Sequence, residues 1–169
     1  MNILAISGSA SEKSSNYYLL KAIQTLFKDK HEITLYDSLP QFPLFTPDRL
    51  KAGIPEIVED FKQRVIETDA VIIYTPEYTH NIPAVVKNMI EWCTHSGEFA
   101  DKKVLPITFT PHEPRGEYAM QSLLFSLHTM NAQIVAQLPL YKTEEIIKDE
   151  LILLSEDTKE LLEGAMELF

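Results

Sequence analysis

Apolar residues in this chain form two kinds of segment: short continuous runs, and longer stretches in which they recur every three or four positions. The short runs predict strands over residues 2–6, 32–36, 70–75, 104–110 and 133–138. The run from Ala70 to Thr75 is apolar almost throughout, which is typical of a strand buried on both faces.

Between these runs the apolar spacing changes to that of amphipathic helices. Helices are predicted over about 16–28, from Pro55 to 66, from Pro83 to 93 and over about 120–130. Since strands and helices alternate along the chain, the predicted fold class is α/β, a doubly wound five-stranded parallel sheet with helices on both faces.

The length of 169 residues suits one well-cored domain, 1–169, which ends in an acidic helical tail over 141–169 capped near Ser155. The segment from Leu39 to Pro55 holds four of the ten prolines and predicts an ordered loop. Its aromatic part, Phe42–Phe45, is a lid over hydrophobic surface, part of a ligand wall or a packed crossover loop.

Composition narrows the class of protein further. A net charge of −10 argues against a nucleic-acid surface, which needs a basic face. No apolar run approaches the ~20 residues of a membrane span, and no signal peptide is expected. The single cysteine, Cys93, fits a reducing compartment, so a cytoplasmic protein is predicted.

The most informative stretch is the hydroxyl-rich loop Ser7–Asn16, which joins the first strand to the first helix and contains five serines. The N-terminus of a helix offers unpaired N–H groups and a partial positive charge, so this loop predicts a phosphate site. The alternative is that Ser14, Ser15 or Asn16 merely caps the helix. The loop is neither a P-loop nor a dinucleotide fingerprint.

Ligands of such sheets lie beyond the carboxyl ends of the strands, where the strand order reverses. That rule selects three loops, Ser7–Asn16, Thr75–Asn81 and Thr110–Tyr118. All three are polar or aromatic, and we therefore expect one site where they meet.

Two of these loops resemble those of the NADPH-dependent FMN reductase family, which has a flavodoxin-like fold with sheet order 2-1-3-4-5. The first loop, Gly8–Asn16, is similar to the family's Gly-Ser-x-Arg-x-x-Ser-x-Asn. The second runs Pro76-Glu77-Tyr78-Thr79-His80-Asn81-Ile82-Pro83 and is followed by Val86-Lys87-Asn88-Met89-Ile90-Glu91-Trp92, similar to the family's Pro-Glu-Tyr-Asn, Ile-Pro and Leu-Lys-Asn-x-Ile-Asp-Trp. The resemblance covers 1–140.

By this resemblance Ser9, Ser14 and Asn16 hold the FMN phosphate, and Pro76, Glu77 and Tyr78 lie against the isoalloxazine ring. The full set of expected cofactor-binding residues is Ser9, Ser11, Ser14, Ser15, Asn16, Pro76, Glu77, Tyr78, Thr79, His80, Asn81 and Arg115. Ser11 stands where the family carries arginine, Thr79 and His80 replace Asn and a small residue, and the third loop lacks the usual Gly-Gly. Lys13 and Arg115 are the cations that we expect to replace that arginine, Lys13 at FMN and Arg115 at the phosphate of NADPH.

The resemblance implies an FMN-dependent oxidoreductase that takes hydride from NADPH or NADH and passes electrons to a flavin, a quinone, an azo compound or a metal oxyanion. The cofactor carries this chemistry, so no catalytic side chain and no metal ligand is predicted. A non-enzymatic flavodoxin-like electron carrier is the alternative. A receiver domain of the same architecture is discarded, because Met1–Gly8 has no acidic residue.

Several single residues have two interpretations each. His80 is a general acid or, as we prefer, a loop histidine that contacts ligand or a neighbouring chain. Glu77 is a structural carboxylate that accepts backbone N–H groups or a contact between subunits. Cys93 is expected in the core and Trp92 in the core or an interface. A homodimer or homotetramer is predicted, because the aromatic loop Phe42–Phe45 is expected to be exposed and Trp92 is expected near the site.

Overall fold

The computed structural model describes residues 1–11, 14–148 and 150–169; the predicted FMN contact Lys13 lies outside these residues. The described strands are β1 (Asn2–Ser7), β2 (Glu32–Tyr36), β3 (Ala70–Thr75), β4 (Lys103–Thr110), β5 (Gln133–Ile134), β6 (Leu138–Tyr141), β7 (Ile146–Lys148) and β8 (Leu151–Leu153). The helices are α1 (Ser15–Phe27), α2 (Pro47–Ala52), α3 (Glu56–Glu67), α4 (Ala84–Cys93), α5 (Glu117–Thr129) and α6 (Glu156–Met166), with short 3-10 turns η1 (Leu39–Gln41) and η2 (Lys142–Glu144).

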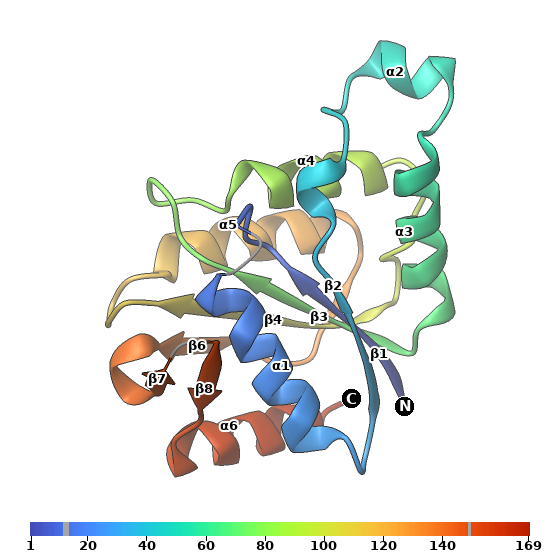
Figure 1. The fold of residues 1–169 in the computed structure, drawn as a ribbon. Coiled ribbons are helices and arrows are strands. Elements are labelled where there is room, and N and C mark those ends of the chain that lie inside the picture. Colours follow the sequence, from blue (N-terminus) through green and yellow to red (C-terminus); the bar gives the residue numbers. More distant parts are fainter. Residues whose placement is uncertain (12–13, 149) are drawn as a thin grey trace.

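The described residues form a parallel sheet in the order β2-β1-β3-β4-β5, with β6 also paired to β4. This order confirms the predicted flavodoxin-like topology (Figure 1). The predicted fifth strand is divided in two, because residues 135–137 separate β5 from β6. Pro139 obscured the second part in the sequence, since a proline counts against a strand; it is tolerated in β6, which lies at the edge of the sheet.

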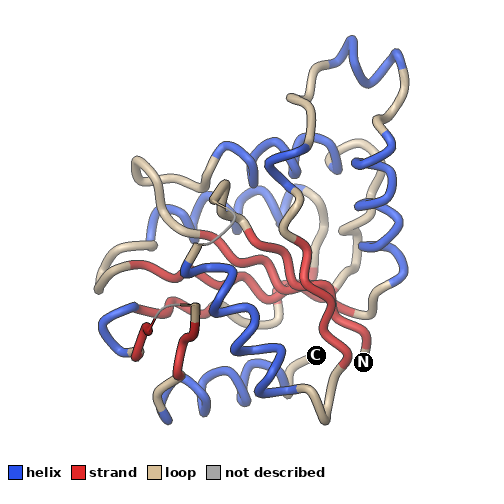
Figure 2. The backbone as a smooth tube through the Cα atoms, in the orientation of Figure 1, coloured by secondary structure: helices blue, strands red, loops and turns tan. Residues whose placement is uncertain are grey.

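Helices cover both faces of the sheet (Figures 1 and 2), and a hydrophobic core lies on each face. Side chains of α3, α4 and α5 fill one core, and those of α1 and α6 fill the other. Strand β3 contributes to both cores, since Ile73 enters the first and Ile72 the second, and every residue of β3 is buried. Burial on both faces is what its continuous apolar run predicts.

The proline-rich segment after β2 is a packed crossover loop, which confirms one of the three interpretations above. Phe42 is buried against Phe61, and their ring centroids lie 5.4 Å apart. Trp92 donates its indole N–H to the carbonyl of Pro43 at 2.8 Å and is itself buried. The expectation of an exposed aromatic loop was therefore wrong, because these rings fill the chain's own core. Helix α2, which Thr46 caps, was not predicted within this segment.

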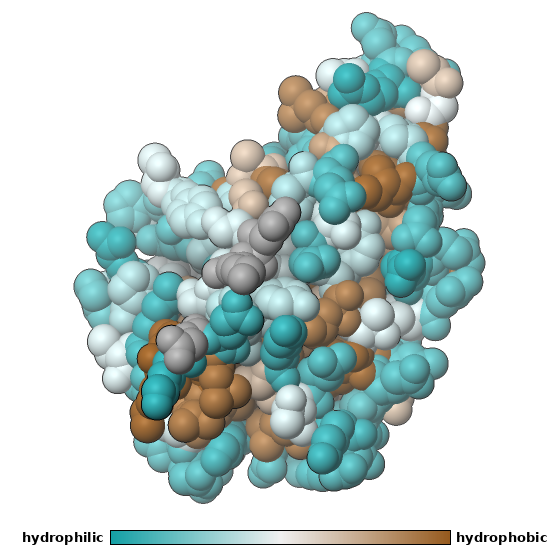
Figure 3. Space-filling model, viewed as in Figure 1, coloured by the Kyte–Doolittle hydropathy of each residue, from teal (hydrophilic) through white to brown (hydrophobic). Residues whose placement is uncertain are grey.

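The C-terminal segment contains more than a helix. Helix α6 begins after the predicted cap Ser155, whose hydroxyl accepts the N–H of Thr158 at 3.2 Å. Before it, β7 and β8 form an antiparallel hairpin that was too short to recognise from periodicity. Figure 3 shows a hydrophobic patch over this hairpin, to which exposed Ile146 and Leu151 contribute. Among the described residues, we find no helix with the length and apolar character needed to cross a membrane.

Candidate functional site

A cleft of about 450 Å³ lies at the carboxyl ends of β1, β3 and β4, where the three predicted loops meet. Because these strands are parallel neighbours, the loops that follow them emerge side by side. The cleft is lined by Ser9, Ser11, Ser14, Ser15, Asn16, Pro76, Glu77, Tyr78, Phe109, Thr110, Pro111, Arg115 and Lys142. Nine of the predicted site residues are in this set.

The first loop leaves β1 in close contact with β3. The N–H of Gly8 donates to the carbonyl of Tyr74 at 2.6 Å. A Cβ atom at Gly8 would lie 2.4 Å from that oxygen and 2.7 Å from a methyl group of Val86, so only glycine fits. The chain then turns through buried Ser9, whose hydroxyl accepts the N–H of Ser11 at 3.2 Å. Gly8 thus sets the direction in which the serine loop enters the cleft.

The N-terminus of α1 forms one wall of the cleft. Ser14 is its N-cap and accepts the N–H of Tyr17 at 3.2 Å, so the capping interpretation is correct for Ser14. The other first-turn N–H groups of a helix have no intrahelical acceptor. Asn16 is only 4% exposed, and its side-chain oxygen has no hydrogen-bond partner among the described residues. A buried, unpaired amide beside a helix N-terminus is a polar group that a ligand can satisfy.

The second loop is a tight turn that presents Tyr78. Tyr78 and Asn81 exchange backbone hydrogen bonds of 2.9 and 3.0 Å, with Thr79 and His80 between them at φ 52° and 54°. Two consecutive left-handed residues are the requirement of a type I′ turn. Thr79, His80 and Asn81 do not line the cleft, so their position supports a role in shaping the loop. Tyr78 lines the cleft and is 51% exposed.

Glu77 accepts the N–H of Ala119 at 3.1 Å, in the first turn of α5. Helix α5 has no side-chain cap of its own, so this carboxylate supplies one from another loop. The interpretation of Glu77 as a structural carboxylate is thereby confirmed. Its other oxygen lies 3.6 Å from Nδ1 of His80, an exposed side chain whose ring packs against Tyr118 with centroids 4.8 Å apart. His80 therefore faces Glu77 and Tyr118, and it is not among the residues that line the cleft.

The third loop contributes Arg115. Its carbonyl accepts the hydroxyl of Thr110 at 2.7 Å, which fixes the loop backbone. Gly116 follows at φ 100°, and a Cβ atom there would lie 3.0 Å from side-chain atoms of Thr108 and Thr110, so both the backbone conformation and the space favour glycine. The guanidinium of Arg115 has no hydrogen bond or ion pair with the described residues, and it lines the cleft.

Two lining residues, Phe109 and Lys142, were missed by sequence analysis. Phe109 is a buried residue near the end of β4. Lys142 follows directly after β6, and its ammonium lies 5.9 Å from the centroid of the Phe109 ring. The rule that selected three loops would also have selected Lys142 if the continuation of the last strand to Tyr141 had been recognised.

The charges around the cleft favour an anion although the chain as a whole is acidic. Arg115 and Lys142 line it with no carboxylate partner among the described residues, and the N-terminus of α1 adds a partial positive charge. The carboxylate in the lining, that of Glu77, is already engaged with α5. Local donors can thus bind a phosphate despite the net charge of −10.

Cys93 and Trp92 lie in the core behind the site. Burial raises the pKa of the Cys93 thiol to about 12, with a smaller contribution from Glu98. At neutral pH the residue is a thiol, and thiols are poor nucleophiles. Cys93 and Trp92 are each 1% exposed, which confirms their expected place in the core.

Comparison with known families gives a match over residues 1–142 to the model described as NADPH-dependent FMN reductase. In solved structures, the chain is similar to FerB, the flavoenzyme NAD(P)H:(acceptor) oxidoreductase of Paracoccus denitrificans. The TM-score is 0.84 at 26% identity, and the similarity covers 99% of this chain and 94% of that one.

Two curated relatives agree with this match. The chain is 35% identical over 126 residues to the NADH:(hydroxy)cinnamate reductase subunit CrdA of Vibrio ruber. The aligned region covers 73% of this chain and 60% of that protein. It is 37% identical over 94 residues to the NADH-dependent flavin reductase subunit 2 of Lactobacillus johnsonii. That aligned region covers 54% of this chain and 48% of the relative. The chain thus spans about half of the length of these relatives.

Proposed function

Because the chain belongs to the NADPH-dependent FMN reductase family, we propose that it is an FMN-dependent NAD(P)H oxidoreductase that passes electrons to a small acceptor such as a flavin, a quinone or an azo compound. The observation that carries this proposal is the cleft itself. It combines the N-terminus of α1, the unpaired side-chain oxygen of buried Asn16 and two cations, Arg115 and Lys142, that have no carboxylate partner among the described residues. The names of the relatives, which act on flavin or on (hydroxy)cinnamate, support the reaction class.

The residues present fit FMN. Ser9, Ser14 and Asn16 surround the start of α1, and in the proposal they hold the phosphate together with the free first-turn N–H groups. The unpaired oxygen of Asn16 accepts from a ribityl hydroxyl, or its amide donates to phosphate after rotation, so either orientation satisfies the buried group. Ser11 and Ser15 add hydroxyls along the same wall.

Pro76, Glu77 and Tyr78 line the same cleft from the second loop, and in the proposal they lie against the ring system. A bound flavin would accept hydride from the nicotinamide and donate electrons to the acceptor. The protein's part is to hold the ring in one orientation. Glu77 contributes by tying this loop to α5, which keeps the loop at a fixed place relative to the third loop. No described side chain has to transfer a proton in this scheme.

The direct test is steady-state oxidation of NADPH and NADH by the purified protein with FMN and a benzoquinone. The proposal predicts turnover that depends on FMN. A non-enzymatic electron carrier would bind FMN yet show no nicotinamide oxidation, so that result would decide for the alternative.

Tyr78 is expected to act through its ring. Since it lines the cleft and half of its surface is exposed, its ring is free to stack on a flavin, and its hydroxyl need not bind. Tyr78→Phe should keep FMN affinity within about twofold, whereas Tyr78→Ala should weaken it by roughly tenfold, the size of one aromatic contact. The measurement is FMN fluorescence quenching; equal losses in both variants would show that the hydroxyl matters.

We also propose a homodimer or homotetramer, now supported by a different surface. Tyr118 and Phe125 are 53% and 75% exposed and lie seven residues apart, on one face of α5. A second copy that packs there would cover both rings. Light scattering at micromolar concentration should give two or four times the chain mass of 19.3 kDa, and Phe125→Asp should reduce it to one. A wild-type mass of 19.3 kDa would contradict the proposal.

Two further parts of the proposal concern the whole chain. In the proposal, residues 1–169 form one domain. Ile152 and Leu162 support this, because they are buried in the same core as the apolar side chains of α1. A cytoplasmic location is proposed because the single cysteine, Cys93, is free and buried.

A further inference from the structure

Lys142 lines the cleft although it lies far along the chain from the serine loop. We propose that Lys142 binds the phosphate monoester of FMN and so replaces the arginine that this chain lacks at Ser11; this inference rests on the proposed function. The first loop carries no cation at position 11, and a phosphate of up to two negative charges gains from a charged donor.

The position of the ammonium group suits this role. Lys142 is half-buried, and its Nζ lies over the ring of Phe109, a buried residue of β4 that also lines the cleft. Ser9, Ser14 and Asn16 line the same cleft. An ammonium ion is a compact charge with three donors, and it can approach a phosphate from any side. Lys142 has no ion pair with the described residues, so its charge is available to a ligand.

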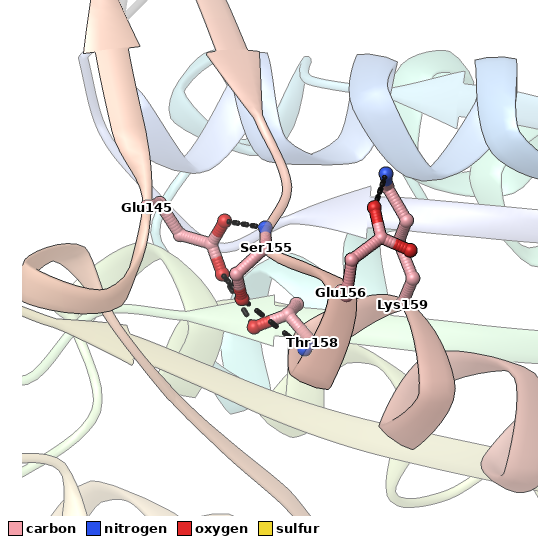
Figure 4. A network of polar contacts seen from close by, with 5 residues as sticks. All are labelled: Glu145, Ser155, Glu156, Thr158 and Lys159. Carbon is pink, nitrogen blue, oxygen red and sulfur yellow. Dashed lines mark hydrogen bonds and ion pairs between the residues drawn. The ribbon is translucent and has the colours of Figure 1, made fainter.

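The C-terminal segment holds the backbone at Lys142 in place. Glu145 ends the same 3-10 turn, and its N–H donates to the carbonyl of Lys142 at 3.3 Å. The Glu145 carboxylate accepts the N–H of Ser155 at 2.7 Å and also the hydroxyl of Thr158, which is buried (Figure 4). Through these bonds the N-terminus of α6 fixes the turn from which Lys142 reaches the cleft.

A neighbouring lysine shows the contrast. Lys159 pairs with Glu156 at 2.6 Å one turn apart on α6, as Figure 4 also shows. Lys51, Lys62 and Lys87 also lie within 4 Å of carboxylates, whereas the ammonium of Lys142 lies near the ring of Phe109 and in the lining of the cleft that holds the serines. Its environment is that of a ligand contact.

Arg115 is the other unpaired cation of the cleft, and the two differ in depth. Arg115 is exposed on the third loop, whereas Lys142 is half-buried beside β4. The deeper cation suits the cofactor, which stays bound through the reaction. The exposed one suits a nicotinamide phosphate, which arrives and leaves in each cycle. The two phosphates are therefore assigned to different side chains.

The test is titration of the apoprotein with FMN and with riboflavin, which lacks the phosphate, followed by fluorescence quenching. Lys142→Met should raise the dissociation constant for FMN by about tenfold, the lower end for a charged hydrogen bond. Lys142→Arg should restore most of the affinity, and Lys142→Met should leave riboflavin affinity unchanged. Added salt should weaken FMN binding less in Lys142→Met than in the wild type. Lys148→Met, which removes an exposed lysine of the hairpin, is the matched control and should bind FMN normally.

The outcomes separate this inference from the proposed function. If the wild-type protein binds no FMN, both proposals are wrong. If the wild type binds FMN and Lys142→Met binds it equally well, the assignment of Lys142 alone is overturned. An unchanged FMN constant with a raised KM for NADPH would place Lys142 at the nicotinamide phosphate and would also contradict the proposal. A circular-dichroism melt of each variant checks that the fold is intact.

Discussion

Replacing Gly8 by alanine should destabilise the protein by about 3 kcal/mol or more and abolish FMN binding. The added Cβ would lie 2.4 Å from the carbonyl oxygen of Tyr74, in the neighbouring strand. Neither backbone can move without breaking the pairing of β1 with β3, in which Ser7 lies opposite Tyr74. The serine loop begins at this point, so any displacement also moves Ser9. Urea unfolding and FMN titration measure the two effects.

Gly164 provides the matched control for this substitution. It lies inside α6, and a Cβ there would meet no atom within 4 Å apart from its chain neighbours and the backbone of its own helix. Gly164→Ala should therefore stabilise the protein by about 0.5–1 kcal/mol, the difference between alanine and glycine inside a helix. Equal effects of the two substitutions would show that the close approach at Gly8 is not a constraint.

Arg115→Ala should raise the KM for NADPH by roughly 10- to 100-fold and leave that for NADH nearly unchanged. The guanidinium lines the cleft without a partner among the described residues, and NADPH differs from NADH by one phosphate. A charged hydrogen bond to phosphate contributes about 1.5–3 kcal/mol, which gives this range of affinity. Steady-state kinetics with both nicotinamides measures it, and NADH is the internal control. If both KM values rise equally, Arg115 does not contact the 2′-phosphate.

The central elements of the fold could be predicted because their patterns are local. Strands β2 and β3 have the predicted bounds, and α1 differs from its prediction by one residue at each end. A buried parallel strand and an amphipathic helix each leave a periodic signal in the sequence. Helix α2 and the hairpin of β7 and β8 left too little signal, because six and three residues per element are shorter than the windows in which periodicity is visible.

The same limit explains what the sequence showed of the site. The first and second loops were found because each lies next to a clear strand and carries a recognisable motif. Lys142 was not found, since Pro139 obscured the strand that precedes it. The interpretation of the loop Phe42–Phe45 stayed open for another reason: proline and aromatic residues together do not show whether the rings face solvent or core. Their partners, such as Phe61, lie in a different helix.

The absorption spectrum of the purified protein tests the central proposal most directly. If the cleft holds FMN, protein mixed with FMN and freed of excess ligand should show the two visible flavin bands. Addition of NADPH without oxygen should then bleach these bands, and a quinone should restore them. Protein that retains no flavin, or flavin bands that NADPH leaves unchanged, would contradict the proposal that this chain is an FMN-dependent NAD(P)H oxidoreductase.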